Sequence, residues 1–335
     1  MRTRLSEEYG LAVPVVAAGM AFIARAPLAA AVSAAGGLGT IGASAMPPEL
    51  LEAEIAAVRA VTDRPFAVNI IPRFAGPELI AAAAGVPVVT FFWDDPDPAW
   101  LETLHDAGTR VWFQVGSPAE AVAAVDAGAD AVVAQGIEAG GHNRSVAGTM
   151  TLVPAVTDAV AVPVIAAGGV ADGRGLAAVL ALGADGALLG TRFIMSAEAD
   201  AAAAYRERIA AAGVGDTARN NVFGLEFPDA TVRGLRTAIV AEYEGRDHPA
   251  PYARLDPAEL PVIGATSMFG QEMPLRRFNG FPPVAATTGD FDQMSLLAGE
   301  TAGLIGDVRP AAEIVAAIAA EAEALVPSSR LQGGR

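Results

Sequence analysis

The sequence contains neither cysteine nor lysine, so apart from histidine its only cationic side chains are those of 22 arginines. The absence of cysteine excludes disulfides, thiolate nucleophiles, cysteine-ligated zinc and iron–sulfur clusters. The absence of lysine excludes Schiff-base chemistry, an anchor for pyridoxal phosphate and a Walker-type phosphate loop. Only three histidines remain for proton transfer near neutral pH. We therefore expect a cofactor to supply any difficult chemistry.

The net charge and the apolar content indicate which partners the protein can have and whether it can form a large core. The formal net charge of −16 argues against nucleic acid and anionic membrane surfaces as partners. Hydrophobic residues make up 53% of the chain, enough for a large core. Arg2 and Arg4 are not followed by an apolar signal segment, and glycines and prolines interrupt the uncharged stretch from Ala26 to Pro48. We expect a cytoplasmic protein that acts on small molecules, with the number of subunits left open.

Short apolar runs alternate with alanine-rich stretches, which is typical of βαβ units and a parallel sheet. Eight runs are predicted to be strands: Val13–Ala17, Gly39–Gly42, Phe66–Ile70, Val86–Phe91, Arg110–Val115, Ala131–Ala134, Val164–Ala167 and Gly186–Leu189. The helices expected after them cover residues 27–35, 48–61, 77–84, 98–107, 118–127, 152–160, 173–182 and 197–212. Eight such units predict an α/β fold of the (β/α)₈ TIM-barrel type over residues 1–212.

The alternation breaks after about Gly213, where aromatic residues, prolines, methionines and arginines become more frequent. We expect residues 213–290 to be an irregular flap or insertion after strand eight, beside the barrel mouth, with one helix near Ala230–Glu244. Residues 291–335 are expected to pack a final helix, Pro310–Leu325, back on the barrel. The tail from Val326 is expected to be frayed.

Glycine-rich turns follow the seventh and eighth predicted strands. The first turn contains Gly168 and Gly169, and the second contains Leu188, Leu189, Gly190 and Thr191. (β/α)₈ barrels commonly hold a phosphate group at these two positions, on backbone N–H groups and a helix N-terminus. The alternative is that both are ordinary tight turns between a strand and a helix.

The sixth predicted strand ends in the loop Gln135–His142, whose glycines bring a histidine to the catalytic face of the barrel. Gln135 could bond a ring carbonyl or nitrogen of a ligand. His142 is the candidate functional histidine, although a lone loop histidine is often only solvated. His105, in the last turn of a predicted helix, and His248, in a turn, are expected to be structural.

Polar residues also end the third and fourth predicted strands. Asn69 could reach the edge of a flavin or a phosphate, or could simply form a turn. Asp94, Asp95 and Asp97 could bind a divalent metal. We favour a helix cap for Asp97 and solvent exposure for the other two, and we predict no metal site.

Together these segments resemble the nitronate monooxygenase family, formerly the 2-nitropropane dioxygenases. The resemblance covers Val13–Phe193 and resumes at 229–242, 296–305 and the last helix; its most specific parts are the Gln135–His142 loop and the two glycine turns. It implies a barrel that binds flavin mononucleotide (FMN), with His142 as the catalytic base. It implies that the cofactor-binding residues are Met20, Asn69, Gln135, Gly140, Gly168, Gly169, Leu188, Leu189, Gly190 and Thr191.

The resemblance also shows two departures. Family members commonly have Ala-Pro-Met-Ala-Gly after the first strand, where this chain has Ala17-Ala18-Gly19-Met20-Ala21. The histidine is commonly followed by Arg-Gly, whereas Asn143, Arg144 and Ser145 follow it here. These changes leave the substrate open.

The leading hypothesis is oxidation of an alkyl nitronate or nitroalkane by flavin and O₂, which gives a carbonyl compound and nitrite. His142 would remove the α-proton of a neutral nitroalkane or position the nitronate. Flavin enoyl-acyl-carrier-protein reductases share the Glu-Ala-Gly-Gly-His loop, so an NAD(P)H-using reductase of an enoyl thioester or a quinone is an alternative. A further alternative is a flavin-free phosphate-binding isomerase or lyase, because fold alone does not determine function.

Overall fold

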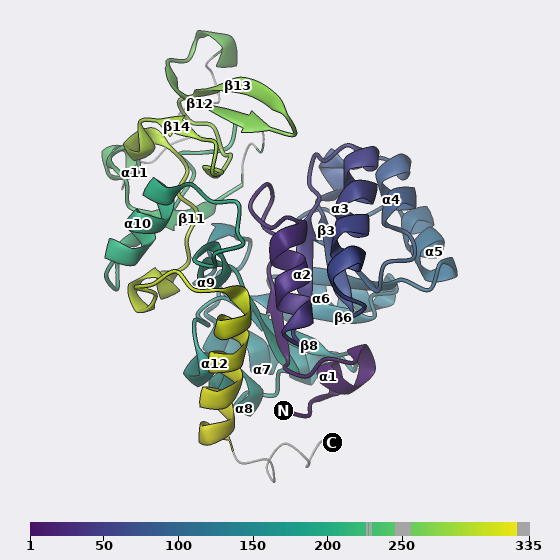
Figure 1. The fold of residues 1–335 in the computed structure, drawn as a ribbon. Helices are drawn as coiled ribbons and strands as arrows, with labels where there is room; N and C mark the ends of the chain where they lie inside the picture. The colour runs from purple at the N-terminus through teal and green to yellow at the C-terminus, as the bar shows by residue number, and fades with distance from the viewer. Residues whose placement is uncertain (226, 228–229, 245–255, 327–335) are drawn as a thin grey trace.

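Eight parallel strands form a closed barrel at the centre of the molecule (Figure 1). They are β1 (Val15–Ala17), β2 (Gly39–Gly42), β3 (Phe66–Ile70), β4 (Val88–Phe91), β5 (Arg110–Val115), β6 (Ala131–Gln135), β8 (Val164–Ala167) and β9 (Gly186–Leu189). β1 pairs with β9, and a bridge between Val16 and Leu38 joins β1 to the chain entering β2. All eight predicted strands are confirmed to within two residues, and so is the (β/α)₈ fold.

The computed structural model describes residues 1–225, 227, 230–244 and 256–326. His248 and residues 327–335 of the predicted tail lie outside the described residues. Among the residues described, no helix is both long enough and apolar enough to cross a membrane. The uncharged stretch from Ala26 to Pro48 contains a helix and strand β2.

Helices surround the barrel as local sequence signals predict. They are α2 (Ala26–Ala34), α3 (Pro48–Val61), α4 (Pro77–Ala83), α5 (Pro98–Asp106), α6 (Pro118–Asp126), α7 (Thr149–Ala159) and α8 (Gly173–Ala181). The side chains of Asp97, Ser117 and Asp172 accept hydrogen bonds from the first backbone N–H groups of α5, α6 and α8. These helices therefore begin where a side chain satisfies the free N–H groups.

The eighth helix of the ring comes from the far end of the chain. After β9 the chain makes only the one-turn helix α9 (Thr191–Ile194) and leaves the barrel. It returns as α12 (Ala311–Leu325), which packs against α8 and α2 (Figure 1). Its buried residues recur at the helical period: Ala311, Ile314, Val315, Ile318 and Ala322. The predicted helix over Pro310–Leu325 is confirmed.

Residues 196–310 contain more regular structure than the sequence predicts. Among the described residues of this region, α10 (Ala203–Ala211) and α11 (Ala238–Tyr243) accompany two small antiparallel sheets and the 3₁₀ helices Pro257–Glu259, Phe291–Gln293 and Glu300–Leu304. The first sheet joins β10 (Thr217–Asn220) and β11 (Val232–Leu235) to β7 (Gly141–His142) of the glycine loop. The second contains β12 (Val262–Met268), β13 (Gln271–Arg276) and β14 (Thr288–Gly289).

Two helix predictions for this region are wrong in part. The helix predicted over 230–244 is a strand in its first half, because Val232–Leu235 pair with β10 and α11 starts only at Ala238. The helix predicted over 197–212 begins at Ala203. Alanine-rich composition favours a helix locally, but tertiary pairing overrides it.

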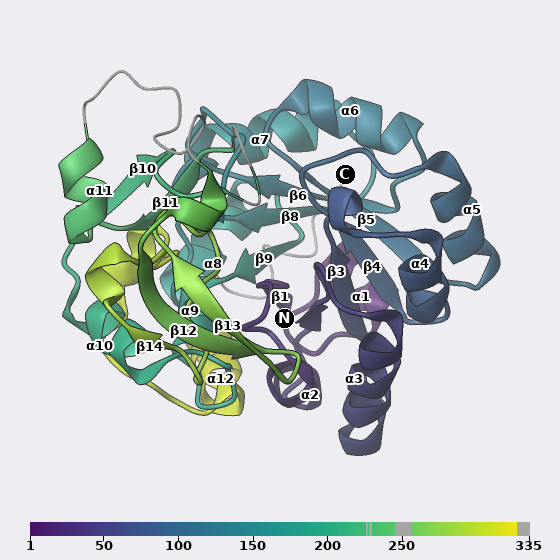
Figure 2. The same ribbon diagram turned by 90° about the horizontal axis from the view of Figure 1, so that it is seen from above.

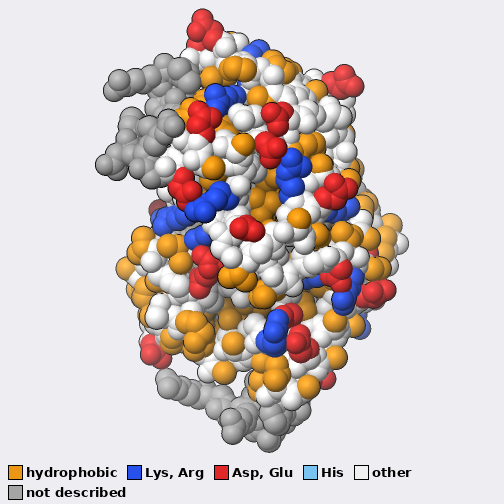
Figure 3. All heavy atoms as spheres, turned by 90° about the vertical axis from the view of Figure 1, so that its left-hand side faces the viewer, with side chains coloured by type: hydrophobic (Ala, Val, Ile, Leu, Met, Phe, Trp, Pro, Cys, Tyr) orange, Lys and Arg blue, Asp and Glu red, His pale blue; other side chains and the backbone are white. Residues whose placement is uncertain are grey.

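We call residues 196–310 the cap. Seen from above, the cap lies over the side of the barrel near α8 and α12 and leaves α3, α4 and α5 uncovered (Figure 2). It has a small apolar core of its own, which includes Phe223, Ile239 and Phe278. On the face shown in Figure 3, carboxylates and arginines are interspersed, so the net negative charge forms no single patch there.

The base of the barrel is filled. Inward-facing apolar side chains form one cluster: Leu5, Leu11, Val16, Leu38, Ala67, Val88, Trp112, Ala131, Val133, Ile165 and Ala167. Helix α1 (Arg4–Tyr9), which the sequence did not predict, closes this end, and Trp112 Nε1 donates a hydrogen bond to the Tyr9 hydroxyl at 2.8 Å. A ligand can therefore enter only at the opposite end, where the strands finish.

Candidate active site

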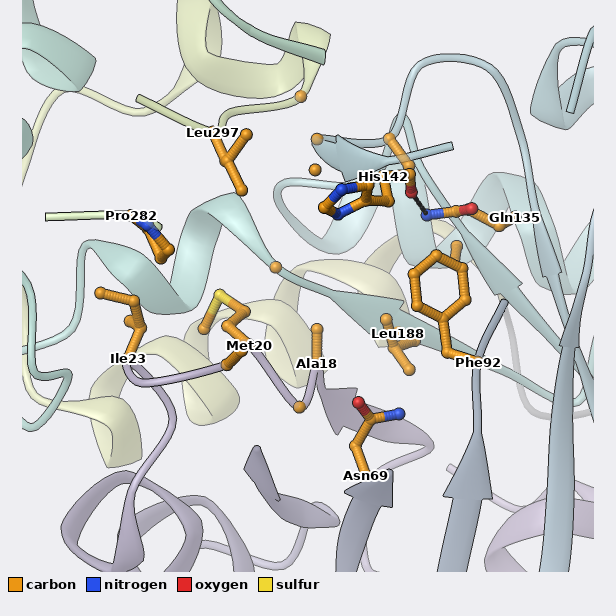
Figure 4. Close-up of a pocket in the computed structure, with 18 of the residues that line it drawn as sticks. Ala18, Met20, Ile23, Asn69, Phe92, Gln135, His142, Leu188, Pro282 and Leu297 are labelled. Atoms are coloured by element: carbon orange, nitrogen blue, oxygen red, sulfur yellow. Dashed lines mark hydrogen bonds between the residues drawn. The ribbon is translucent and has the colours of Figure 1, made fainter. Parts of the chain in front are cut away.

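A cavity of about 380 Å³ lies at the carboxyl ends of the strands (Figure 4). Its wall combines the barrel, the glycine loop after β6 and the cap. The barrel side contributes Met20 and Ile23, and the cap contributes Pro282, which lies beside Ile23, and Leu297 (Figure 4). A cavity of this size with a largely apolar wall is typical of a small-molecule site.

A ring of polar side chains forms the floor of the cavity. It consists of the inward-facing residue near the end of five successive strands, β2 to β6: Thr40, Asn69, Thr90, Gln114 and Gln135. Alternate residues of a strand point to the same side. These five residues therefore point into the barrel, like the apolar residues two positions earlier in the chain, which fill the base of the barrel. Asn69 Nδ2 donates to Thr90 Oγ1 at 2.7 Å, which leaves the Asn69 carbonyl for a ligand.

The glycine loop is stabilised as a strand of the cap sheet. Its residues Gly141 and His142 form β7, which pairs with Arg233 and Val232 of β11. Gln135 Nε2 donates to the His142 carbonyl oxygen at 3.1 Å (Figure 4). The residue predicted to bind a flavin therefore also fixes the backbone of the candidate base.

Asn143 organises the loop from within, because its buried side chain bonds three backbone groups. Its Nδ2 donates to the carbonyls of Gly136 at 2.9 Å and Ala139 at 3.3 Å, and its Oδ1 accepts from Ser145 N at 3.0 Å. The carbonyl oxygen of Asn143 accepts from Arg219 Nη2 at 3.0 Å. Arginine and asparagine therefore hold the backbone beside His142 in place.

The His142 ring lies at the top of the cavity, between Leu297 and Phe92 (Figure 4). Its Nε2 atom is buried and has no hydrogen-bond partner among the described residues. Burial, with a smaller effect of the Arg73 charge, lowers the pKa of His142 from 6.5 to about 4. The imidazole is therefore neutral at pH 7 and has a free ring nitrogen that can accept a proton.

The glycine turns provide a cradle with free backbone donors. The N–H groups of Gly168, Gly169, Gly190 and Thr191 have no acceptor among the described residues. Gly168 and Gly169 have φ of 93° and 73°, which glycine adopts without strain. A Cβ on Gly168 would lie 3.0 Å from Ala139 N, so a side chain there would crowd the glycine loop. Orphan N–H groups in a glycine cradle suit a phosphate group.

The structure brings together all but one of the residues that were predicted to form the site. Those that line the cavity are Met20, Asn69, Gln135, Gly140, His142, Gly168, Gly169, Leu188, Gly190 and Thr191. Leu189 does not line it: its side chain is buried in the layer between strands and helices. Strand alternation explains the difference, since Leu188 faces inward and its neighbour Leu189 faces outward.

Sequence reasoning missed two kinds of residue in the site. Thr90 and Gln114 are polar residues near the ends of apolar strands, which is a readable signal. Tyr205, Phe227, Phe281 and the other lining residues of the cap carry no such signal, because only folding brings the cap over the barrel.

Two of the three aspartates after β4, Asp94 and Asp97, have structural partners, and Asp95 is exposed; the expected solvent exposure is therefore wrong for Asp94. Asp94 accepts two hydrogen bonds from Arg73, at 2.7 and 2.6 Å, and these bonds lower the pKa of Asp94. Asp97 caps α5. His105, at the other end of the barrel, pairs with Asp130 at 3.0 Å. No group of three or more His, Asp or Glu side chains within the described ranges is arranged to hold a metal ion.

Relatives of the chain share most of its length. A Mycobacterium tuberculosis protein, named a 5-hydroxy-7a-methyl-1-oxo-octahydro-1H-indene-4-carboxyl-CoA dehydrogenase, is 39% identical over 76% of this chain and 71% of its own length. A probable nitronate monooxygenase from Staphylococcus aureus is 32% identical over 86% of this chain and 93% of its own.

Solved structures agree with this relationship. FabK from Thermotoga maritima superimposes with a TM-score of 0.80 at 35% identity, covering 98% of this chain and 99% of FabK. A nitroalkane oxidase from Streptomyces ansochromogenes gives a TM-score of 0.76 at 29% identity, covering 96% and 98%. The family model of nitronate monooxygenase matches residues 2–77 and 74–321. The chain, a flavin-dependent oxidoreductase, therefore belongs to the nitronate monooxygenase family.

Proposed function

We propose that the protein is an FMN-dependent nitronate monooxygenase that oxidises nitroalkanes and alkyl nitronates with O₂ to carbonyl compounds and nitrite. The observation that carries the proposal is the buried, unpartnered Nε2 of His142, at a cavity that the glycine cradle also lines. The cradle would bind the single phosphate of FMN, and Met20 with the polar residues of the floor would hold its ring. When bound, FMN supplies the redox chemistry with O₂.

Residues of the chain carry out proton transfer, bind the substrate and orient the base. His142 Nε2 accepts the α-proton of a neutral nitroalkane, which leaves the nitronate. The apolar side chains Ile23, Phe92 and Leu297 hold the carbon chain of the substrate and exclude water. Gln135 holds the His142 carbonyl, so the base keeps its orientation as the proton moves.

A second candidate is an FMN-dependent reductase that takes hydride from NAD(P)H and acts on an enoyl thioester or a quinone. The 39% identity to a protein named as a carboxyl-CoA dehydrogenase favours it. The two candidates use the same cavity and differ in the compound that reduces the flavin.

Purified protein is expected to absorb as a flavoprotein and to release FMN, not the dinucleotide, on heating. Under anaerobic conditions a nitronate should then bleach the flavin within the time of one turnover, and NADH or NADPH should not. Rapid bleaching by NAD(P)H, with none by any nitronate, would establish the reductase. A colourless protein that FMN cannot reconstitute would refute both candidates.

Substitutions in the cradle are expected to weaken FMN binding without unfolding the protein. A Cβ on Gly190 would make only ordinary contacts, the nearest with Ala18 Cβ at 3.7 Å, and the two methyl groups of Gly190→Val are expected to take up ligand space. Gly169→Ala adds about 1–2 kcal/mol of backbone strain and one methyl group. Cofactor affinity, measured by flavin fluorescence, should fall at least about 10-fold in Gly190→Val.

Gly85→Ala is the matched control for backbone strain. Gly85 has φ of 80°, close to the 73° of Gly169, and a Cβ there would meet nothing within 4 Å. It follows α4, away from the cavity. The control should show the strain as lower stability and bind FMN normally. Normal FMN affinity in both cradle variants would place the phosphate elsewhere.

A further inference from the structure

Three side chains from three different elements form a stack beside the cavity. The Arg73 guanidinium carbon lies 4.1 Å from the ring centroid of Phe227, and the Phe227 and His142 centroids are 4.4 Å apart with their planes tilted by 42°. Arg73 belongs to the 3₁₀ helix Pro72–Phe74, and Phe227 belongs to the cap. Phe227 therefore separates a cation from the candidate base.

Packing contacts and an ion pair hold the three side chains of the stack in place. Phe227 is 3% exposed and packs in an apolar cluster with Ile71 and Ala230, and also against the ring of Trp93 at 5.2 Å. Trp93 in turn lies 5.8 Å from the His142 ring. Asp94 holds Arg73 through two hydrogen bonds, so the guanidinium cannot swing away without breaking an ion pair. These contacts determine the position of Phe227.

We propose that Phe227 is a positioning residue for His142: its ring seals one face of the imidazole from solvent and separates it from the Arg73 guanidinium. A buried imidazole next to a cation stays uncharged, because both surroundings disfavour the protonated form. The cap thereby keeps the base ready to accept a proton over a wide pH range. Loading the protein with FMN and the rate measurement below rest on the proposed function, whereas the ring titration itself needs no substrate.

Other charged groups around the loop are already paired or bonded. Arg144 pairs with Glu120 and lies over Trp93, and Arg233 pairs with Glu300 and bonds the Ile137 carbonyl. Glu138, the one carboxylate in the loop, accepts from Thr149 N and Oγ1. Arg219 donates to the Asn143 carbonyl. Arg73 is the charge that acts on the His142 pKa.

The experiment is an NMR titration of the histidine rings in the FMN-loaded protein. The chain has only three histidines, so the spectrum of His142→Ala assigns the signal of His142. Wild type, Phe227→Ala, Phe227→Leu and Arg73→Met are compared, with circular dichroism and flavin content as checks of folding. The pH dependence of kcat/KM for a neutral nitroalkane is measured in parallel.

Wild type should titrate at about pH 4. Phe227→Ala admits water to the imidazole, so the His142 pKa should rise by roughly 1–2 units, toward the value of an exposed histidine. Because the neutral ring is the base, kcat/KM is lost as the pH falls through this pKa. With a rise of about 2 units, to about 6, the activity of Phe227→Ala at pH 5.5 would be about 4-fold below its plateau.

Phe227→Leu keeps an apolar cover and should keep the low pKa, which separates shielding from a general loss of structure. Arg73→Met should raise the pKa by less than Phe227→Ala, because burial is the larger cause. A wild-type pKa near 6.5, or one unchanged in Phe227→Ala, would overturn the proposal. Should Phe227→Ala fail to fold, a rise in Phe227→Leu equal to or larger than that in Arg73→Met would overturn it as well.

Discussion

Replacing His142 with alanine is expected to lower turnover of a neutral nitroalkane by about 10²–10⁴-fold, the usual contribution of a positioned general base. FMN should stay bound, because the predicted cradle lies at the glycine turns and not at the imidazole. Turnover of the pre-ionised nitronate should fall much less, since its α-proton has already been removed. Steady-state rates with the two forms of one nitroalkane measure the difference.

The low pKa of His142 does not conflict with this role. Desolvation opposes the imidazolium in the absence of a counterion. Proton transfer from a nitroalkane creates the imidazolium and the nitronate anion together, and the attraction between these charges offsets the desolvation. Below about pH 4 the ring is protonated before the substrate binds, so activity on the neutral nitroalkane should be lost there.

His105→Ala is the matched control for loss of an imidazole. His105 lies in the last turn of α5 and contacts Asp130, away from the cavity. This variant should keep wild-type turnover of both substrate forms. Equal rates of neutral-nitroalkane oxidation in wild type and His142→Ala would falsify the catalytic role, and an equal loss with both forms would reduce His142 to a binding residue.

Asn143→Ala is expected to destabilise the fold by about 2–4 kcal/mol, because it leaves the Ala139 carbonyl and the N–H of Ser145 without their partners and removes one of the two donors to the Gly136 carbonyl. The glycine loop should lose its shape, and His142 would move relative to the substrate. Misplacement of about 1 Å can lower a rate on the order of 10²-fold. Urea unfolding and kcat with a neutral nitroalkane measure the two effects.

Asn220→Ala is the control for Asn143→Ala. Asn220 also makes two local backbone bonds, to Ala218 O at 3.2 Å and from Val222 N at 3.1 Å, but it does not contact the glycine loop through these bonds. The Asn220→Ala substitution should lower the free energy of unfolding and leave kcat unchanged. If Asn143→Ala folded with normal stability and kcat, the loop would not depend on this side chain.

The asparagine at 143 is also one of the departures that the sequence shows from its family. From sequence, the replacement of Arg-Gly by Asn143-Arg144-Ser145 only placed the substrate in doubt. The structure gives Asn143 a role that no spacing rule predicts, because its three backbone partners are all defined by the folded loop. Arg144 reaches Glu120 and lies over Trp93, both outside the loop.

The barrel and its two glycine turns could be predicted because their signals are local. A strand is an apolar run, a helix start is a capping residue or a proline, and a cradle is a pair of glycine turns after two successive strands. Each signal lies within a few residues and depends on backbone sterics and hydrogen bonds of that segment alone. The sequence by itself therefore determined the (β/α)₈ fold, the glycine turns and the loop that carries His142.

Only the tertiary structure decided what surrounds His142. Phe227 of the cap and Trp93 after β4 contact the imidazole, and Arg73 after β3 lies over Phe227, because the cap folds over the barrel. The same holds for α12, which completes the ring of helices from the far end of the chain. Such contacts depend on how distant apolar faces pack together, and neither periodicity nor composition encodes them locally. The pKa of His142 also depends on the tertiary structure, because burial is the main cause of its low value and burial is a property of the whole fold.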